Sequence, residues 1–166
     1  MVEQNHTKGA GMGEKNMKDW ERKSGSVLED LRIPSQVKLA GLWAAVMFMY
    51  IYVDIIGFYQ PGLIADILVG KVWVFDITPT WMLLSLMLMT VPTLMVFLSL
   101  ALPAKANRYT NIGLGAFHIL LAVGTAAGEI HAHYIFGSVV EVVLLALIVW
   151  IAWKWPRVTS HSAVED

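Results

Sequence analysis

The sequence predicts an all-α protein, a four-helix up-down bundle that spans a membrane. The chain is 57% hydrophobic over 166 residues, and its mean hydropathy of +0.59 is too high for an ordinary soluble domain. It contains four apolar runs, each long enough for the roughly 20 residues that a helix needs to cross the hydrocarbon core. The runs lack the alternation of a barrel strand, and a helix satisfies its own backbone hydrogen bonds in lipid. We expect the spans at residues 37–58, 80–102, 109–128 and 134–155, within a transmembrane domain of residues 37–157.

The segments on either side of this domain are polar. Residues 1–25 carry charges of both signs and little apolar surface, so we expect a flexible cytoplasmic tail there. Ser26 and Glu29 form a capping pattern, and a short interfacial helix is predicted within residues 26–36. Residues 158–166 form a second predicted cytoplasmic tail. The mixed charge ahead of the first apolar run is unlike a cleavable signal peptide.

Basic residues predict the orientation. Six of the 12 Lys and Arg precede the first span, with Lys38 at its start, and only Lys71 lies in a connection predicted to face outward. By the positive-inside rule, both termini and the link between the second and third spans are cytoplasmic.

The connections predict how the helices are arranged. The links after the second and third spans are short, which makes consecutive helices antiparallel neighbours. The first connection, residues 59–79, is longer and contains the apolar stretch 63–69, broken by Asp66. We expect a short helix there, entered through Pro61 and Gly62 and left at Gly70.

The third span carries a polar stripe. Asn111, His118, Thr125 and Glu129 follow at spacings of seven, seven and four residues, so they share one helix face. Gly124 and Gly128 form a Gly-x-x-x-Gly pair on another face, which favours close packing against a second helix or a second copy of the chain. The sequence therefore predicts a homo-oligomer through the Gly124/Gly128 face.

Two carboxyl groups lie inside predicted spans. Asp54 is about one turn from the outer end of the first span, and Glu141 is about two turns into the fourth. Such residues normally face the bundle interior or a partner. We expect His118 to contact Glu141, and a proton or cation relay through Tyr50, Asp54, His118, Thr125, Glu129 and Glu141. In the alternative interpretation the same groups only tie the helices together by hydrogen bonds.

Glu129, His131 and His133 are candidate metal ligands. In an extended loop these alternate residues point the same way, and carboxylate with imidazole suits Zn or Cu. The alternatives are solvated residues at the bundle mouth or a loop that responds to pH. No other cofactor is predicted. The chain has no cysteine, which excludes disulfides, thiolate metal sites and covalent c-type haem.

Several function classes have no support in the sequence. Nucleotide-binding, Rossmann and common hydrolase motifs are absent. The basic residues cluster at helix ends and form no nucleic-acid-binding stripe, so the expected partner is the lipid bilayer.

Three stretches resemble a family of small prokaryotic four-helix membrane proteins known as a domain of unknown function. They are residues 40–54 (AGLWAAVMFMYIYVD) with 60–62 (QPG), residues 91–103 (VPTLMVFLSLALP), and residues 134–141 (YIFGSVVE) continuing to Pro156. The resemblance implies a multi-pass protein of the prokaryotic plasma membrane. It places Asp54, Pro61, Gly62, Glu129 and Glu141 in matching motifs. The layout is also similar, more distantly, to DoxX-like four-helix proteins.

Three functions fit these observations. The first is a small transport or permeation component, or an accessory subunit, with a polar bundle interior. The second is a membrane oxidoreductase or quinone-interacting subunit in which His118 and Glu141 handle protons. The third is a structural or regulatory anchor whose tail binds a partner.

Overall fold

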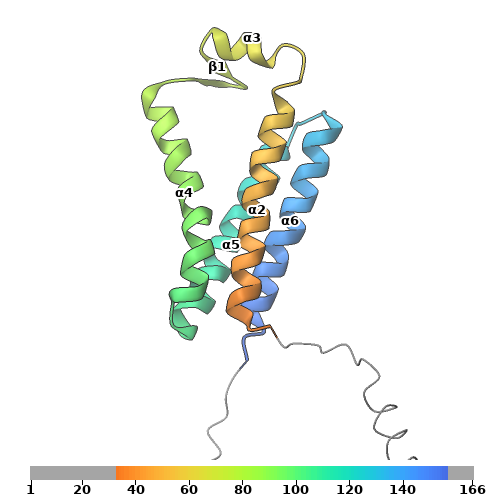
Figure 1. Cartoon of the computed structure of the whole chain (residues 1–166). Coiled ribbons are helices and arrows are strands. Elements are labelled where there is room, and N and C mark those ends of the chain that lie inside the picture. The colour runs from red at the N-terminus through yellow and green to blue at the C-terminus, as the bar shows by residue number, and fades with distance from the viewer. Residues whose placement is uncertain (1–32, 157–166) are drawn as a thin grey trace, which may run out of the picture. The chain divides into compact units, whose positions relative to one another are not determined.

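A computed structural model describes residues 33–156, and within that range the predicted all-α fold is confirmed (Figure 1). Four long helices pack together and alternate in direction, and each is long and apolar enough to cross a membrane. They are α2 (Ser35–Gly57), α4 (Pro79–Ala101), α5 (Ala104–Ala126) and α6 (Ala132–Trp153). The protein is thus of the multi-pass membrane type.

The predicted tails, residues 1–25 and 158–166, lie outside the described residues. So does most of the predicted interfacial helix, whose last two residues, Ser35 and Gln36, begin α2 instead.

Local chemistry explains where the helices start and stop. Thr78 caps α4: its hydroxyl accepts a hydrogen bond from the backbone N–H of Trp81 at 3.1 Å, and proline follows as the first helical residue. α4 ends ahead of Pro103, because the residue before a proline is driven out of the helical conformation, and Leu102 is extended with a ψ of 145°. After α5, Gly128 adopts a φ of +89°, which only glycine takes readily.

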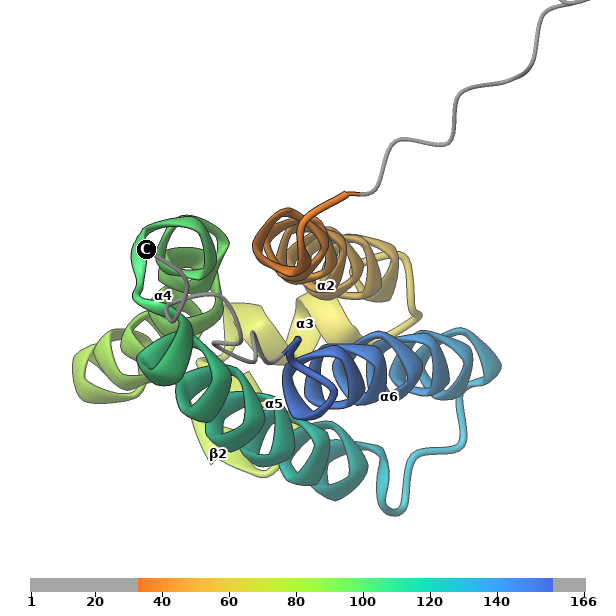
Figure 2. The same ribbon diagram turned by 90° about the horizontal axis from the view of Figure 1, so that it is seen from below.

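The helices pack in a ring, seen end-on in Figure 2. α2 packs against α4 and α6, and α6 packs against α5, whereas α4 and α5 have the least contact of the neighbouring pairs. Fully buried apolar side chains fill one end of the bundle, the end that contains the start of α2 and the end of α6. They are Leu39, Trp43, Val46, Met95, Leu145 and Ile148. The opposite end of the bundle, next to the connection between α2 and α4, is less well filled by buried side chains.

Two glycines mark the closest approaches of helices. A methyl group on Gly137 of α6 would overlap the side chain of Val53 on α2, and one on Gly115 of α5 would lie 2.8 Å from Val149 Cγ2 on α6. Both glycines are buried. Absent side chains at these points let α6 approach both of its neighbours closely.

The first connection contains the predicted short helix, α3 (Leu63–Leu68), with the positive-φ residues Gly62 before it and Gly70 after it. It also contains a hairpin that the sequence analysis did not predict. Strands β1 (Lys71–Val72) and β2 (Phe75–Asp76) pair antiparallel across a two-residue turn, where Trp73 has a φ of 51°. In Figure 1 this connection crosses between the ends of α2 and α4.

Candidate functional site

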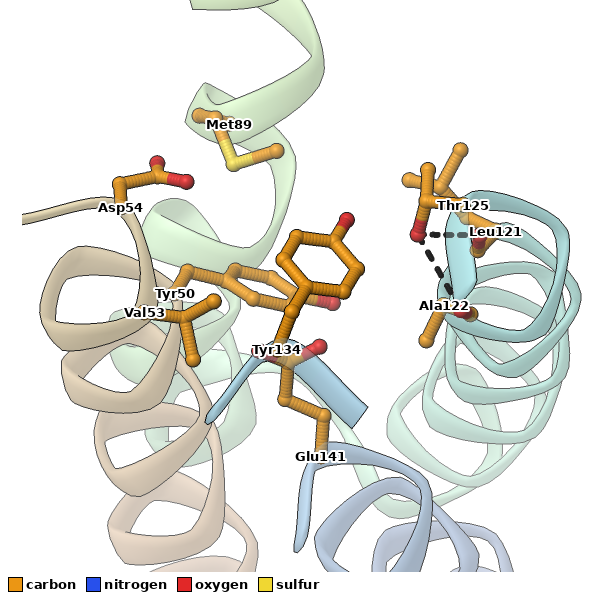
Figure 3. Close-up of a pocket in the computed structure, with 9 residues that line it drawn as sticks. All are labelled: Tyr50, Val53, Asp54, Met89, Leu121, Ala122, Thr125, Tyr134 and Glu141. Atoms are coloured by element: carbon orange, nitrogen blue, oxygen red, sulfur yellow. Dashed lines mark hydrogen bonds between the residues drawn. The ribbon is translucent and has the colours of Figure 1, made fainter. Parts of the chain in front are cut away.

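A cavity of about 110 Å³ opens in the less filled end of the bundle (Figure 3). All four long helices line it. The lining residues are Tyr50, Val53 and Asp54 of α2, Met89 of α4, Leu121, Ala122 and Thr125 of α5, and Tyr134 and Glu141 of α6. The wall thus combines two carboxyl groups, two phenols and several apolar side chains.

The two carboxyl groups of the cavity differ in environment. Glu141 is only 6% exposed, and no residue of the described part of the chain gives its side chain a hydrogen bond. Asp54 is exposed and lies one turn from the end of α2. The close approach of α2 and α6 places both carboxyl groups at the same cavity, since Val53 precedes Asp54 and Gly137 lies one turn before Glu141.

Tyr50 joins the cavity to a buried histidine. Its hydroxyl lies 3.2 Å from Nδ1 of His118, which is 0% exposed. The predicted pairing of His118 with Glu141 is therefore wrong: Nδ1 contacts Tyr50, Nε2 has no partner within residues 33–156, and His118 does not line the cavity that Glu141 lines. The imidazole also meets the rings of Trp43 and Phe117 edge-on, at centroid distances of 5.9 and 5.4 Å.

His118 keeps one buried polar atom without a protein partner. Within residues 33–156, Nε2 has no hydrogen bond. A buried imidazole nitrogen without a partner is costly unless water or another polar group reaches it.

A network of buried amides lies one heptad below His118, toward the filled end of the bundle. Asn111 Oδ1 accepts a hydrogen bond from Trp43 Nε1 at 2.7 Å and a longer one from the Ser99 hydroxyl at 3.4 Å. Asn111 Nδ2 donates to the side-chain oxygen of Asn107 at 2.6 Å and to its backbone oxygen at 2.9 Å. Asn107 Nδ2 in turn donates to the backbone oxygen of Ser99 at 2.6 Å, so the network ties α2, α4 and α5 together.

Sequence reasoning found Asn111 but missed Ser99 and Asn107. Asn107 precedes Asn111 by four residues and so lies on the same face of α5, which is the signal that could have extended the stripe by one turn. The rest of the predicted stripe divides: Thr125 lines the cavity, whereas Glu129 lies beyond the end of α5.

Glu129 organises the short link between α5 and α6. Its carboxylate accepts hydrogen bonds from the backbone N–H groups of Ile130 at 2.9 Å and His131 at 3.0 Å, and it also contacts Nδ1 of His131. The backbone N–H and then the side chain of His131 lower the pKa of Glu129 from its ordinary value.

The geometry assumed for a metal site at Glu129, His131 and His133 is not present. His133 belongs to the first turn of α6 rather than to an extended segment, so the three side chains do not alternate along one strand. In the part of the chain that the structure describes, no three His, Asp or Glu side chains are placed to hold a metal ion.

Comparison with known proteins identifies a family. A family of unknown function, DUF6326, matches residues 30–162. The chain belongs to the DUF6326 family. No curated protein and no solved structure is significantly similar to it. The family agrees with the resemblance noted in the sequence, and its description assigns no activity.

Among the described residues of this DUF6326 protein, the predicted glycine pair makes no close contact with another helix. A methyl group on either Gly124 or Gly128 would meet nothing within 4 Å. Gly124 is exposed on α5, and Gly128 is accounted for by its positive φ. Oligomerisation through the Gly124/Gly128 face stays a prediction.

Proposed function

We propose that the protein is a membrane transport component that binds a cation in the cavity between its four helices. The observation that carries the proposal is the position of Glu141, which is almost fully buried, lacks a hydrogen-bond partner within residues 33–156, and lines the same cavity as Asp54. An acidic side chain within a membrane span costs about 2.5–3.5 kcal/mol on insertion scales. A bound cation or proton offsets that cost, which is the reason to expect one at this position.

Tyr50 supports a route from the cavity toward the bundle centre. Its hydroxyl lines the cavity and lies within hydrogen-bond distance of His118. A proton that reaches the carboxyl groups therefore has a titratable acceptor one step deeper, and imidazole is suited to pass it on. Beyond His118 the amide network and the apolar core fill the bundle, so passage requires a second conformation. The weakly packed seam between α4 and α5 is where we expect the helices to move.

Proton flux into liposomes tests the proposal. The purified chain is reconstituted with a pH-sensitive dye inside the vesicles, and a potassium gradient with valinomycin sets the membrane potential. We expect Glu141→Gln to abolish the flux and Asp54→Asn to reduce it. The matched control is Asp66→Asn, which neutralises an exposed carboxylate on α3 away from the cavity. A wild-type protein that carries no flux, or a Glu141→Gln variant that carries normal flux, refutes the proposal.

The expected alternative of a quinone-interacting subunit places His118 beside a lipid-soluble substrate. His118 lies behind Tyr50 and does not line the cavity, so we favour cation binding.

A further inference from the structure

We infer that the ligand of the cavity is an organic ammonium ion, an amine or quaternary nitrogen that carries small apolar groups. The inference rests on the proposed function, because it names the substrate class of the same cavity. The cavity lining, the state of its oxygen atoms, and its size and access support it.

The cavity lining contains apolar side chains, which an inorganic ion does not need. Val53, Met89, Leu121 and Ala122 contribute apolar side chains that lie among the polar groups of the lining (Figure 3). Hard cations such as Ca²⁺ take six to eight oxygen ligands and gain nothing from apolar side chains. An ammonium ion with methyl or methylene groups buries its apolar surface against such side chains while its charge remains near the carboxylates.

The polar groups of the cavity differ in how they are held. The Thr125 hydroxyl shares its single hydrogen between two backbone oxygens of its own helix, Leu121 O and Ala122 O, both at 3.1 Å. The Tyr50 hydroxyl contacts His118. No hydrogen bond within residues 33–156 engages the side-chain oxygens of Glu141, Asp54 or Tyr134. The two carboxyl groups supply the negative charge that a cation needs, and the apolar side chains between them favour a cation that carries apolar groups.

Two aromatic rings also line the cavity. Tyr50 and Tyr134 both line the cavity, and in the view of Figure 3 their rings lie between Asp54 and Glu141. Aromatic faces attract ammonium groups through the ring quadrupole, and combinations of rings with a carboxylate are typical of sites for quaternary nitrogen.

Size and access agree with a small organic group. One water needs roughly 10–15 Å³ of such space, so a cavity of about 110 Å³ takes several non-hydrogen atoms. The lining includes residues of both α4 and α5, the neighbouring helices that contact each other least.

Binding of choline tests the inference, with its neutral isostere 3,3-dimethylbutan-1-ol as the comparison. Titration calorimetry on the purified protein in a non-ionic detergent measures both, together with NaCl and KCl as competitors. We expect choline to bind and the isostere to bind at least about tenfold more weakly, because the isostere has the same shape without the charge. Sodium and potassium at the same concentration should displace little choline.

Four variants locate the site. Glu141→Gln should weaken choline binding by about 30-fold or more, since it removes the buried charge. Tyr134→Leu should weaken it by roughly 3- to 30-fold and Tyr134→Phe should leave it nearly unchanged, because only the ring face is needed. Asp66→Asn should bind as wild type does. The Tyr134 pair keeps the test informative if Glu141→Gln does not fold.

Three outcomes overturn the inference: no choline binding, equal binding of the neutral isostere, or full displacement by sodium or potassium. Its failure is distinguishable from failure of the proposed function. Proton flux that depends on Glu141 without choline binding leaves the transport proposal standing. Choline binding that depends on Glu141 and Tyr134 without any proton flux leaves a binding site and removes proton transport.

Discussion

Gly137 should be the glycine of the bundle least tolerant of a side chain. In Gly137→Ala the new methyl group would overlap Val53 Cγ2 and lie 3.6 Å from Val53 Cβ and Cγ1. Valine in a helix has one strongly preferred rotamer, so the side chain cannot turn away and the two helices must separate. Overpacking of this kind costs about 1–3 kcal/mol, from which up to ~1 kcal/mol of improved helix propensity is subtracted. With the full subtraction, we expect a net loss of up to about 2 kcal/mol in the free energy of unfolding.

Equilibrium unfolding in mixed micelles with increasing SDS, followed by tryptophan fluorescence, measures this loss. The matched control is Gly124→Ala, whose methyl group meets nothing within 4 Å, so it should leave the stability unchanged or raise it by up to ~1 kcal/mol. A second control adds Val53→Ala to Gly137→Ala. Because the smaller side chain removes the overlap, the double variant should be more stable than the sum of the single changes predicts.

Two results would refute this reasoning. One is a Gly137→Ala variant as stable as Gly124→Ala. The other is strict additivity of Val53→Ala and Gly137→Ala, which would mean that the two residues do not set the spacing of α2 and α6.

Three further predictions concern polar groups. A double-mutant cycle of Trp43→Phe with Asn111→Leu should give a coupling energy of about 0.6–1.7 kcal/mol, which is the range of interhelical hydrogen bonds in membranes. Unfolding in SDS measures this energy, and a value near zero would show that the 2.7 Å contact between the two side chains adds nothing to stability. The stabilisation that Glu129 provides should be fully present above pH ~4.5 and be lost as the pH falls through the lowered pKa of its carboxyl group. The difference in unfolding free energy between wild type and Glu129→Gln should therefore shrink below pH ~4.5, and a difference that is constant down to pH ~3 contradicts this. Thr78→Ala should destabilise α4 by about 1 kcal/mol through loss of its N-cap, seen as faster amide exchange in the first turn of α4 but not in α6.

Much of the fold could be predicted from the sequence, because apolar length and proline position act locally. The four helices start and end within a few residues of the predicted spans, and Pro103 and Pro156 follow the ends of α4 and α6. The hairpin at Lys71–Val72 and Phe75–Asp76 was missed because two-residue strands are too short to show a period.

The candidate site could be predicted only in part, because depth in the membrane does not determine which way a side chain faces. His118 and Glu141 were paired because their positions along the two helices match. The structure gives the hydrogen bond of His118 to Tyr50 on α2, which the rotation of each helix about its axis decides. The glycine pattern did not locate the close approaches within one copy of the chain: Gly115 and Gly137, outside any such motif, lie where the backbones approach, whereas oligomerisation through Gly124 and Gly128 stays a prediction.

The shared hydroxyl of Tyr50 has a consequence for communication through the bundle. A phenol carries a single hydrogen, so it cannot donate to Nδ1 of His118 and to a carboxylate of the cavity at the same time. When a carboxylate of the cavity accepts that hydrogen, Nδ1 of His118 can keep its contact with the hydroxyl only by carrying a hydrogen of its own, as in the other tautomer. The polarity of the buried nitrogen Nε2 then changes, so a change at the cavity alters the imidazole that packs against Trp43 without movement of any helix.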